Sequence, residues 1–307
     1  MQKLVIIVGP TAVGKTTLSL KIAQKFNGEI VSGDSMQIYR GLDIGTAKAT
    51  PKEQAQVPHH LIDIADPTEN YSAAKFVQAA QKAIDNITNQ GKLPILVGGT
   101  GFYIQALLGD RPLAVLPEID DPEFISHWTQ IAHEQGEEKV RAALKKVDSV
   151  SEARILPGQI RRLVRALLIS THTGKPFSSL QPEPKRRYDA LIIGLTTDRQ
   201  LLYKRINERV DIMMNAGILD EARFVKTLPT DSTAQRAIGY KELFDYLTGT
   251  SSYEDSVAKL KRNSRRYAKR QMTWFNNQFT DINWYDVIQN PNQLDQIMDQ
   301  LNKFMSE

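Results

Sequence analysis

The sequence predicts an α/β protein in which a parallel sheet is flanked by helices and one all-helical segment is inserted between its strands. Short apolar runs rich in β-branched residues recur along the chain, with helical patterns between them. Leu4–Val8 is the first of these runs and Tyr188–Leu195 is the last. Between Gly109 and Arg187 only helical patterns follow one another. The 307 residues are enough for one large or two smaller domains.

The first apolar run leads into Gly9-Pro10-Thr11-Ala12-Val13-Gly14-Lys15-Thr16, which matches the phosphate-binding P-loop pattern G-x-x-x-x-G-K-[ST]. A helical pattern follows directly, so strand, loop and helix occur in the required order. This predicts a P-loop NTPase-like core with a nucleotide-binding, ATP-binding type of motif. The loop N–H groups and the helix N-terminus cradle oxyanions, Lys15 adds a positive charge, and the Thr16 hydroxyl can ligate Mg²⁺. The motif indicates a diphosphate or triphosphate ligand and leaves the reaction open.

Composition sets further bounds. The chain has no cysteine, which excludes disulfides, thiolate zinc sites and a cysteine nucleophile and is compatible with a reducing compartment. The first strand begins at Leu4, which leaves no room for a signal peptide, and no apolar run approaches the ~20 residues of a membrane span. We therefore expect a cytoplasmic protein. The net charge of +4 is a mild bias, but the basic residues are clustered.

Two polar side chains follow strands of the predicted sheet. Asp34 comes after the strand that ends near Ser32, and Thr100 comes after Leu93–Val97. Residues just past the carboxyl ends of parallel strands line the ligand crevice, so both are expected beside the P-loop. Asp34 is either a general base or Mg²⁺ ligand, or the N-cap of a helix at Ser35–Tyr39. Thr100 either faces the ligand or caps the next helix.

Two further stretches lie between these strands and the insertion. The small-residue loop Gly41–Lys48 carries one lysine and is expected to point towards a ligand. Pro58–Ile64 alternates like a third strand, and its pair His59 and His60 lacks metal-ligand spacing, which favours a structural role. An amphipathic helix is predicted over Tyr71–Gln90.

Residues 113–187 form the predicted helical insertion domain, and residues 1–112 and 188–307 form the core domain. The insertion begins in a proline-containing stretch over residues 112–122 and continues with four helical patterns, at Asp121–Gln135, Glu137–Lys146, Ser149–Leu156 and Gln159–His172. In the last of these, Arg161, Arg162 and Arg165 lie off the apolar face. They are either a solvated basic surface or part of a polyanion-binding surface.

A long helix is predicted over Arg199–Asn215, with Arg205 and Arg209 on its flank. These arginines either bind a diphosphate or pair with the nearby Glu208 or Asp211. A short basic turn, Arg236–Lys241, follows further along the chain.

Lys259–Phe275 is the most basic stretch, and its first twelve residues contain no acid. Arg262, Arg266, Lys269 and Arg270 lie along one side of the predicted helix, with aromatic residues interleaved. This pattern indicates a phosphate-backbone contact surface rather than a merely soluble helix, which would mix signs.

We next ask which class of protein would carry both a phosphate-binding loop and separate basic clusters. A small-molecule kinase accounts for the loop alone. A nucleic-acid motor accounts for both, but such motors carry an apolar strand that ends in an acid, whereas here the strand ends Leu96-Val97-Gly98-Gly99-Thr100. A third possibility is that the P-loop binds a diphosphate leaving group.

Along nearly the whole chain the sequence resembles the bacterial tRNA dimethylallyltransferases (tRNA isopentenyltransferases). The P-loop is shared by many families, whereas the Asp34–Tyr39 and Gly41–Lys48 blocks are far more specific. The matching blocks are Gly9–Thr16, Asp34–Tyr39, Gly41–Lys48, His60–Pro67, Val97–Tyr103, Arg161–Leu167, Arg205–Met213, Ala237–Lys241 and Tyr267–Trp274.

The resemblance implies transfer of a dimethylallyl group from dimethylallyl diphosphate to N6 of adenosine 37 in tRNA, with release of diphosphate. Asp34 would be the general base, and Arg209 would complete the diphosphate clamp. Thr100 would orient either the adenine or the surroundings of the reacting carbon. The adenosine would be flipped out of the anticodon loop. Mg²⁺ is the expected cofactor, held through Thr16, and a monomer is expected. An ATP-dependent kinase acting on RNA or a small molecule is the alternative. The residues expected to bind tRNA are Asp34, Ser35, Met36, Gln37, Arg161, Arg162, Arg165, Arg236, Lys241, Arg262, Arg266, Lys269 and Arg270.

Overall fold

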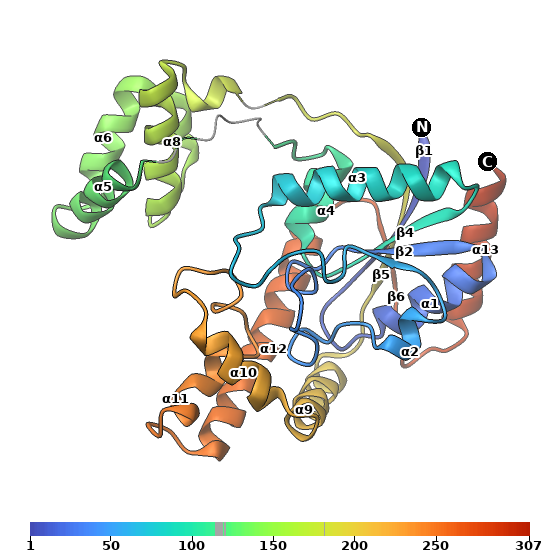
Figure 1. Ribbon diagram of the computed structural model, residues 1–307. Helices are drawn as coiled ribbons and strands as arrows, with labels where there is room; N and C mark the ends of the chain where they lie inside the picture. The colour runs from blue at the N-terminus through green and yellow to red at the C-terminus, as the bar shows by residue number, and fades with distance from the viewer. Residues whose placement is uncertain (114–118, 120, 181) are drawn as a thin grey trace. The chain divides into compact units, whose positions relative to one another are not determined.

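The computed structural model describes residues 1–113, 119, 121–180 and 182–307, which divide into two compact units. The core unit comprises Met1–Leu108 and Arg186–Glu307, and the inserted unit is Gly109–Lys185 (Figure 1). The sequence-based boundaries fall a few residues later, after residues 112 and 187. Much of the proline-containing stretch over residues 112–122, namely 114–118 and 120, lies outside the described residues.

The core unit is built on a six-stranded sheet in the order β3-β2-β4-β1-β5-β6, and every strand pair in it is parallel. The central strand β1 pairs with β4 on one side and with β5 on the other. The predicted fold class, a parallel sheet flanked by helices, is therefore confirmed. The strands are β1 (Gln2–Val8), β2 (Gly28–Ser32), β3 (His59–His60), β4 (Leu93–Val97), β5 (Tyr188–Leu195) and β6 (Ile282–Tyr285).

Strand β3 is much shorter than the predicted strand Pro58–Ile64. Leu61 and Asp63 have φ angles of 62° and 58°, a left-handed backbone that cannot continue a strand. His60 hydrogen-bonds Glu29 and His59 contacts the Val57 carbonyl oxygen, so both histidines are structural. Among the described residues, no group of three or more His, Cys, Asp or Glu side chains is placed to hold a metal ion.

Helices cover both faces of the sheet because successive apolar side chains of β1 point to opposite faces. Val5 and Ile7 pack towards α1 (Lys15–Lys25), α9 (Arg199–Asn215) and α13 (Gln293–Ser306). Leu4 and Ile6 pack towards α3 (Ala73–Asn89) and α4 (Gly101–Leu108). The predicted apolar stripe of α3 is confirmed, since all of its members are buried: Phe76, Ala80, Ala83, Ile84 and Ile87.

A third apolar cluster joins the loops after β2 to the segment that follows α9. It lies between Ile38 and Leu42 on one side and residues of α10 (Ile218–Thr227) on the other. The long helix α12 then returns towards the sheet. The remaining short elements and this helix are α2 (Pro51–Gln54), η2 (Lys241–Leu243), α11 (Phe244–Leu247) and α12 (Tyr253–Gln278).

The inserted unit is all-helical and has its own core, formed by residues such as Val140, Leu144 and Leu163. The buried Arg141 ties it together, since it pairs with Glu137 and Glu152 and donates to backbone oxygens. Its helices are α5 (Pro122–Glu134), α6 (Glu137–Val147), α7 (Ser149–Arg154), α8 (Ile160–Thr173) and η1 (Phe177–Leu180). Across both units, none of the described helices combines the length and apolar character that crossing a membrane requires.

Candidate functional site

The P-loop connects β1 to α1 at the carboxyl edge of the sheet. Gly14 precedes α1 with a φ of 103°, and no side chain of the described residues caps that helix. Its first N–H groups are therefore available to an anion. Lys15 lies over the loop and donates from Nζ to the carbonyl oxygens of Gly9 (3.0 Å) and Pro10 (2.8 Å). A Cβ on Gly9 would collide with the Leu195 carbonyl oxygen, which explains the glycine there.

Two helices hold the tip of the P-loop. From α9, Arg205 donates from Nε to the Ala12 carbonyl oxygen at 2.9 Å, and Arg209 reaches Thr11 Oγ1 at 3.4 Å. From α12, Gln271 accepts the Thr11 N–H through Oε1 at 2.9 Å. Ala12 has a φ of 67°, an uncommon left-handed value for a residue with a side chain, so the tip adopts a strained shape that these contacts support.

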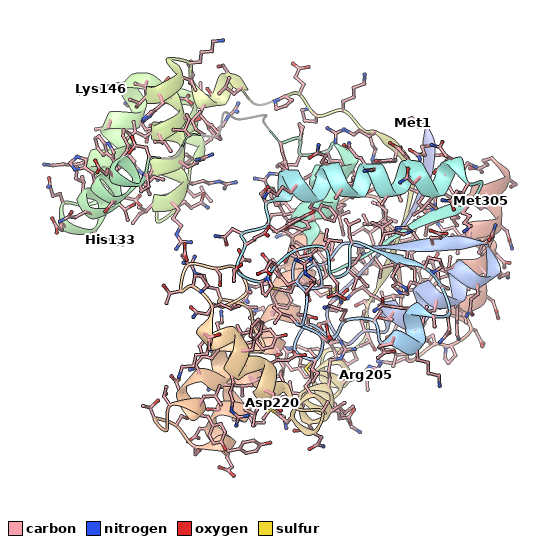
Figure 2. All side chains as sticks on the ribbon, in the orientation of Figure 1. Met1, His133, Lys146, Arg205, Asp220 and Met305 are labelled. Carbon is pink, nitrogen blue, oxygen red and sulfur yellow. The ribbon has the colours of Figure 1, made fainter. Side chains whose placement is uncertain are left out.

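The sequence left open that the two α9 arginines pair with Glu208 or Asp211. This alternative is wrong. Glu208 lies 3.9 Å from Lys204, and Asp211 pairs with Lys261 at 2.6 Å. Both arginines turn instead towards the phosphate-binding loop, as the hydrogen bonds of Arg205 and Arg209 show (Arg205 is labelled in Figure 2).

Asp34 follows β2 and is half-buried. Its Oδ1 accepts the Met36 N–H at 2.8 Å, which fixes the carboxylate in a turn. The predicted helix at Ser35–Tyr39 is wrong, because these residues form a series of turns; the carboxylate caps a turn rather than a helix.

Thr100 follows β4 and lies beside Ser35. Its hydroxyl accepts the Ser35 N–H at 3.2 Å and lies 3.4 Å from Ser35 Oγ. The first turn of α4 is bonded to the Thr100 carbonyl oxygen instead, so the hydroxyl does not cap that helix. The loops after β2 and β4 are thereby joined next to Asp34.

The charged groups of the site influence one another. Burial and, to a smaller extent, the positive charge of Arg209 lower the pKa of Lys15 to about 8, with the charge of Asp34 opposing them. Burial raises the pKa of Asp34, against the Met36 N–H and the charge of Lys15. Burial and the charge of Arg205 lower the pKa of Arg209. Lys15, Asp34 and Arg209 therefore share one desolvated site.

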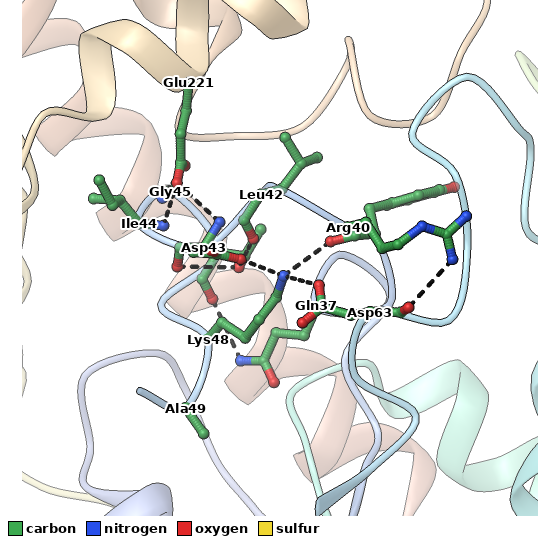
Figure 3. A network of polar contacts seen from close by, with 12 residues as sticks. Gln37, Arg40, Leu42, Asp43, Ile44, Gly45, Lys48, Ala49, Asp63 and Glu221 are labelled. Carbon is green, nitrogen blue, oxygen red and sulfur yellow. Dashed lines mark hydrogen bonds and ion pairs between the residues drawn. The ribbon is translucent and has the colours of Figure 1, made fainter. Parts of the chain in front are cut away.

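The loop Gly41–Lys48 does not point towards a ligand, contrary to the expectation. The buried Lys48 donates to the Tyr39 carbonyl oxygen and pairs with Asp43 (2.5 Å) and Asp63 (2.6 Å), as Figure 3 shows. The carboxylate of Glu221 accepts the N–H groups of three loop residues. This loop is an internal support because its charge and its N–H groups are already satisfied within the protein.

The support extends to Gln37, one of the residues expected to bind tRNA. Gln37 Nε2 donates to the carbonyl oxygens of Thr46 and Ala47, and its Oε1 accepts from Ser32 Oγ at 2.9 Å. Ser35, Met36 and Gln37 are each half-buried beside Asp34. The Gly41–Lys48 loop thus fixes the segment that carries Asp34.

Helix α12 presents its basic residues on two sides. Lys261 pairs with Asp211 and Lys259 with Asp245, and Arg265 donates to Asn207. The others, which we call the basic ridge, are exposed and make no ion pair with any described residue: Arg262, Arg266, Lys269 and Arg270. Three ridge residues line a groove of about 530 Å³ that Trp274 also lines.

The remaining candidate tRNA-binding residues are also exposed. Arg161, Arg162 and Arg165 lie on the outer face of α8, where Arg162 donates to Gln159. Arg236 and Lys241 lie in the core unit on either side of the buried Tyr240. No salt bridge within the described part of the chain involves any of these five residues.

Comparison with known proteins identifies the family. The family model described as IPP transferase matches residues 37–278, which is most of the chain. The chain belongs to the IPP transferase family. A curated tRNA dimethylallyltransferase of Limosilactobacillus reuteri is 48% identical over 311 residues and the match covers 100% of both chains. One from Geobacillus kaustophilus is 50% identical over 289 residues, covering 93% of this chain and 91% of the relative.

A solved structure supports the assignment to the IPP transferase family. The full-length tRNA isopentenylpyrophosphate transferase of Bacillus halodurans superposes with a TM-score of 0.73 at 42% identity, covering 100% of this chain and 97% of that one. The resemblance recognised in the sequence is therefore confirmed.

Two residues of this IPP transferase site have no role in the sequence-based prediction. Gln271 is 5% exposed and bonds both the P-loop and the loop after β4. Burial raises the pKa of Tyr267, and so does the charge of Asp34, which shows that this phenol lies near the carboxylate. A polar residue in the apolar stripe of α12, between Ala268 and Phe275, was the available signal for Gln271.

Proposed function

We propose that the protein transfers the dimethylallyl group of dimethylallyl diphosphate to N6 of adenosine 37 in tRNA and releases diphosphate. The observation that carries this proposal is the position of Asp34, a base candidate in electrostatic contact with the P-loop Lys15, in a chain of the IPP transferase family. Curated relatives about half identical to this chain are named tRNA dimethylallyltransferases, which supports the same substrates.

The P-loop binds the diphosphate in this proposal. Free N–H groups of the P-loop and of the first turn of α1 face its oxygens, while the Thr11 N–H stays bonded to Gln271. Lys15 exchanges its bonds to Gly9 and Pro10 for bonds to the diphosphate. Arg209 adds a second charge at Thr11. These groups stabilise the negative charge that grows on the leaving oxygen as the bond between carbon and oxygen breaks.

The same site accepts the proton of the acceptor amine. The N6 nitrogen attacks C1 of the dimethylallyl group, a new C–N bond forms, and the diphosphate leaves with the electrons of the C–O bond. Asp34 takes one N6 proton, and its raised pKa suits it to hold that proton. The Thr100 hydroxyl, already bonded to the Ser35 segment, orients the adenine.

Mg²⁺ is proposed as the cofactor because the donor set fits it. Thr16 offers a hydroxyl oxygen at the start of α1, next to the P-loop that would hold the diphosphate. Mg²⁺ prefers such hard ligands and is commonly bound by one or two protein groups together with phosphate oxygens and water. When bound, the ion neutralises charge on the diphosphate.

The tRNA is proposed to contact both basic clusters. The basic ridge of α12 and the α8 arginines Arg161, Arg162 and Arg165 are exposed and free of ion pairs with described residues, as phosphate-binding side chains must be. N6 of a stacked base is out of reach, so adenosine 37 is flipped into the site, which costs least in a single-stranded anticodon loop. We also propose that the protein acts as a monomer in the cytoplasm.

The test is incubation of the protein with unmodified tRNA, Mg²⁺ and labelled dimethylallyl diphosphate, followed by digestion to nucleosides. Labelled N6-dimethylallyladenosine is expected from this tRNA, and a matched tRNA with guanosine at position 37 should remain unlabelled. Equal labelling of both tRNAs would contradict the proposed acceptor, and labelling of neither would contradict the proposed function.

A further inference from the structure

Gln271 occupies an unusual position in the core unit, since its nearly fully buried amide is hydrogen-bonded to two loops of the site. Its Oε1 accepts the Thr11 N–H of the P-loop at 2.9 Å, and its Nε2 donates to the Gly99 carbonyl oxygen at 3.1 Å. The residue itself is 5% exposed and belongs to α12. One side chain therefore fixes the distance between the diphosphate-binding loop and the loop that carries Thr100.

The backbone around this amide is shaped to admit it. A Cβ on Gly99 would collide with Gln271 Nε2, so only glycine permits the hydrogen bond at this distance. Next to Thr11, Ala12 is held with a φ of 67°. Such strain persists only where surrounding contacts impose it, and the bond between Gln271 and Thr11 is one of those contacts.

Gln271 also links the two surfaces of α12. Within one turn of it lie Lys269 and Arg270 of the exposed basic ridge and Tyr267 beside Asp34. The helix is a continuous 26-residue element, so its placement and that of the P-loop tip are fixed together through this amide.

We propose that Gln271 is a positioning residue that holds the tip of the P-loop in the conformation that binds diphosphate and sets its distance from Thr100. It touches neither substrate in this role and acts through Thr11 and Gly99. The inference rests on the proposed function only for the identity of the phosphate ligand. Inorganic diphosphate is therefore the probe, because its binding can be measured without prenyl transfer.

The first measurement is calorimetric titration of inorganic diphosphate with Mg²⁺ into wild type and Gln271→Met, a variant of similar length that cannot form either hydrogen bond. Loss of two buried hydrogen bonds predicts a dissociation constant raised about tenfold. The matched control is Asn276→Met on the exposed side of α12, which should bind like wild type. Equal binding by Gln271→Met and wild type would overturn the proposal.

The second measurement distinguishes positioning from a general structural role and uses Gln271→Glu. An ionised carboxylate can accept the Thr11 N–H but cannot donate to Gly99, and it repels the diphosphate. The protonated form restores both bonds, since its O–H donates and its C=O accepts. The ratio of the variant's dissociation constant to that of wild type at the same pH should therefore fall as the pH is lowered. A ratio independent of pH would overturn the proposal, even if Gln271→Met failed to fold.

Failure of the proposed role of Gln271 can be distinguished from failure of the proposed function. Steady-state kinetics of Gln271→Met should show a raised KM for dimethylallyl diphosphate together with a lowered kcat, because the loop and Thr100 are both displaced. If wild type binds diphosphate but transfers no prenyl group, the proposed function is wrong and the role of Gln271 at the loop still stands on the binding measurements.

Discussion

At the scale of single residues, the site depends on three charged side chains that are held partly out of water. Burial disfavours the charged forms of Lys15 and Asp34, and each partly offsets this for the other. Arg209 adds a positive charge that lowers the pKa of Lys15 further. A bound diphosphate would face the positive charges of both Lys15 and Arg209 at the P-loop.

The pH profile follows from these shifts. In the proposed mechanism, donor binding uses Lys15 in its ammonium form and proton transfer uses Asp34 as the carboxylate. We expect kcat/KM to fall as the pH rises through the Lys15 pKa of about 8 and to fall again below the raised pKa of Asp34. Steady-state rates over a pH series check this. A profile that is flat across pH 8 would mean that Lys15 does not titrate in the free enzyme.

The Asp34→Asn substitution tests the base. The amide keeps the size of the side chain but cannot accept the N6 proton, so the single-turnover rate should fall by about 10²–10⁴ with tRNA affinity little changed. Asp85→Asn, at an exposed position of α3, is the matched control and should leave the rate unchanged. A near-normal rate in Asp34→Asn would leave Asp34 only its turn-capping bond to Met36.

The Arg209→Ala and Lys15→Ala substitutions test the clamp. Each removes a charge directed at the leaving group, so each should raise KM for dimethylallyl diphosphate and slow the transfer. Arg199→Ala, at the exposed start of the same helix α9, serves as control. If Arg209→Ala had the kinetics of wild type, Arg209 would have no role in the clamp beyond its hydrogen bond with Thr11.

Sequence patterns could identify residues whose role depends on local spacing, and they failed where the role depends on distant partners. Lys15 was predictable because the P-loop motif fixes its position. Lys48 was expected at a ligand, but its partner Asp63 and the loop-binding Glu221 come from elsewhere in the chain. Gln271 was overlooked because its two partners precede it by more than 170 residues.

At the scale of elements, α12 has two chemically different sides. One side carries Gln271 and Phe275 into the core unit, and the other carries the exposed basic ridge. The acids that neutralise this helix are used on its flank towards α9 and α11, where Lys261 meets Asp211 and Lys259 meets Asp245. The ridge is therefore left available for polyanions.

Salt dependence tests the two basic clusters. Arg266→Ala/Arg270→Ala and Arg161→Ala/Arg165→Ala should each weaken tRNA binding and leave diphosphate binding unchanged. Each lost contact should flatten the plot of log affinity against log salt by roughly 0.7 for single-stranded and roughly 0.9 for duplex phosphates. Lys21→Ala/Lys25→Ala, on the exposed side of α1, is the control. An unchanged slope in both test variants would show that these arginines are only solvated.

Elements with strong periodicity were predictable almost to the residue. The strand Tyr188–Leu195 and the helix Arg199–Asn215 have the bounds expected from the sequence. The strand β6 and the helix α13 were not predicted. The short β6 has all of its residues half-buried, and it is stabilised by pairing with β5 rather than by its own pattern.

At the scale of the whole molecule, the chain combines a core unit that carries the P-loop with an inserted helical unit, each with its own apolar core. The insertion leaves the sheet intact because the chain departs after Leu108 and returns at Arg186, and β5 then pairs with β1. The fold class could be predicted because each of its two patterns is visible within short stretches of sequence. One pattern is the alternation of strands and helices in the core unit, and the other is the run of helices in the inserted unit. The tRNA-binding role of the inserted unit stays a prediction.

The P-loop of this protein is proposed to bind the diphosphate of a prenyl donor rather than the phosphates of ATP. The most direct measurement is the stoichiometry of diphosphate release, followed together with nucleoside modification in reactions that contain unmodified tRNA. We expect one diphosphate for each dimethylallyl group transferred, with no requirement for ATP and no ATP consumed when it is added. Hydrolysis of ATP stimulated by tRNA, without prenyl transfer, would show that the proposed function is wrong and favour an ATP-dependent kinase or motor.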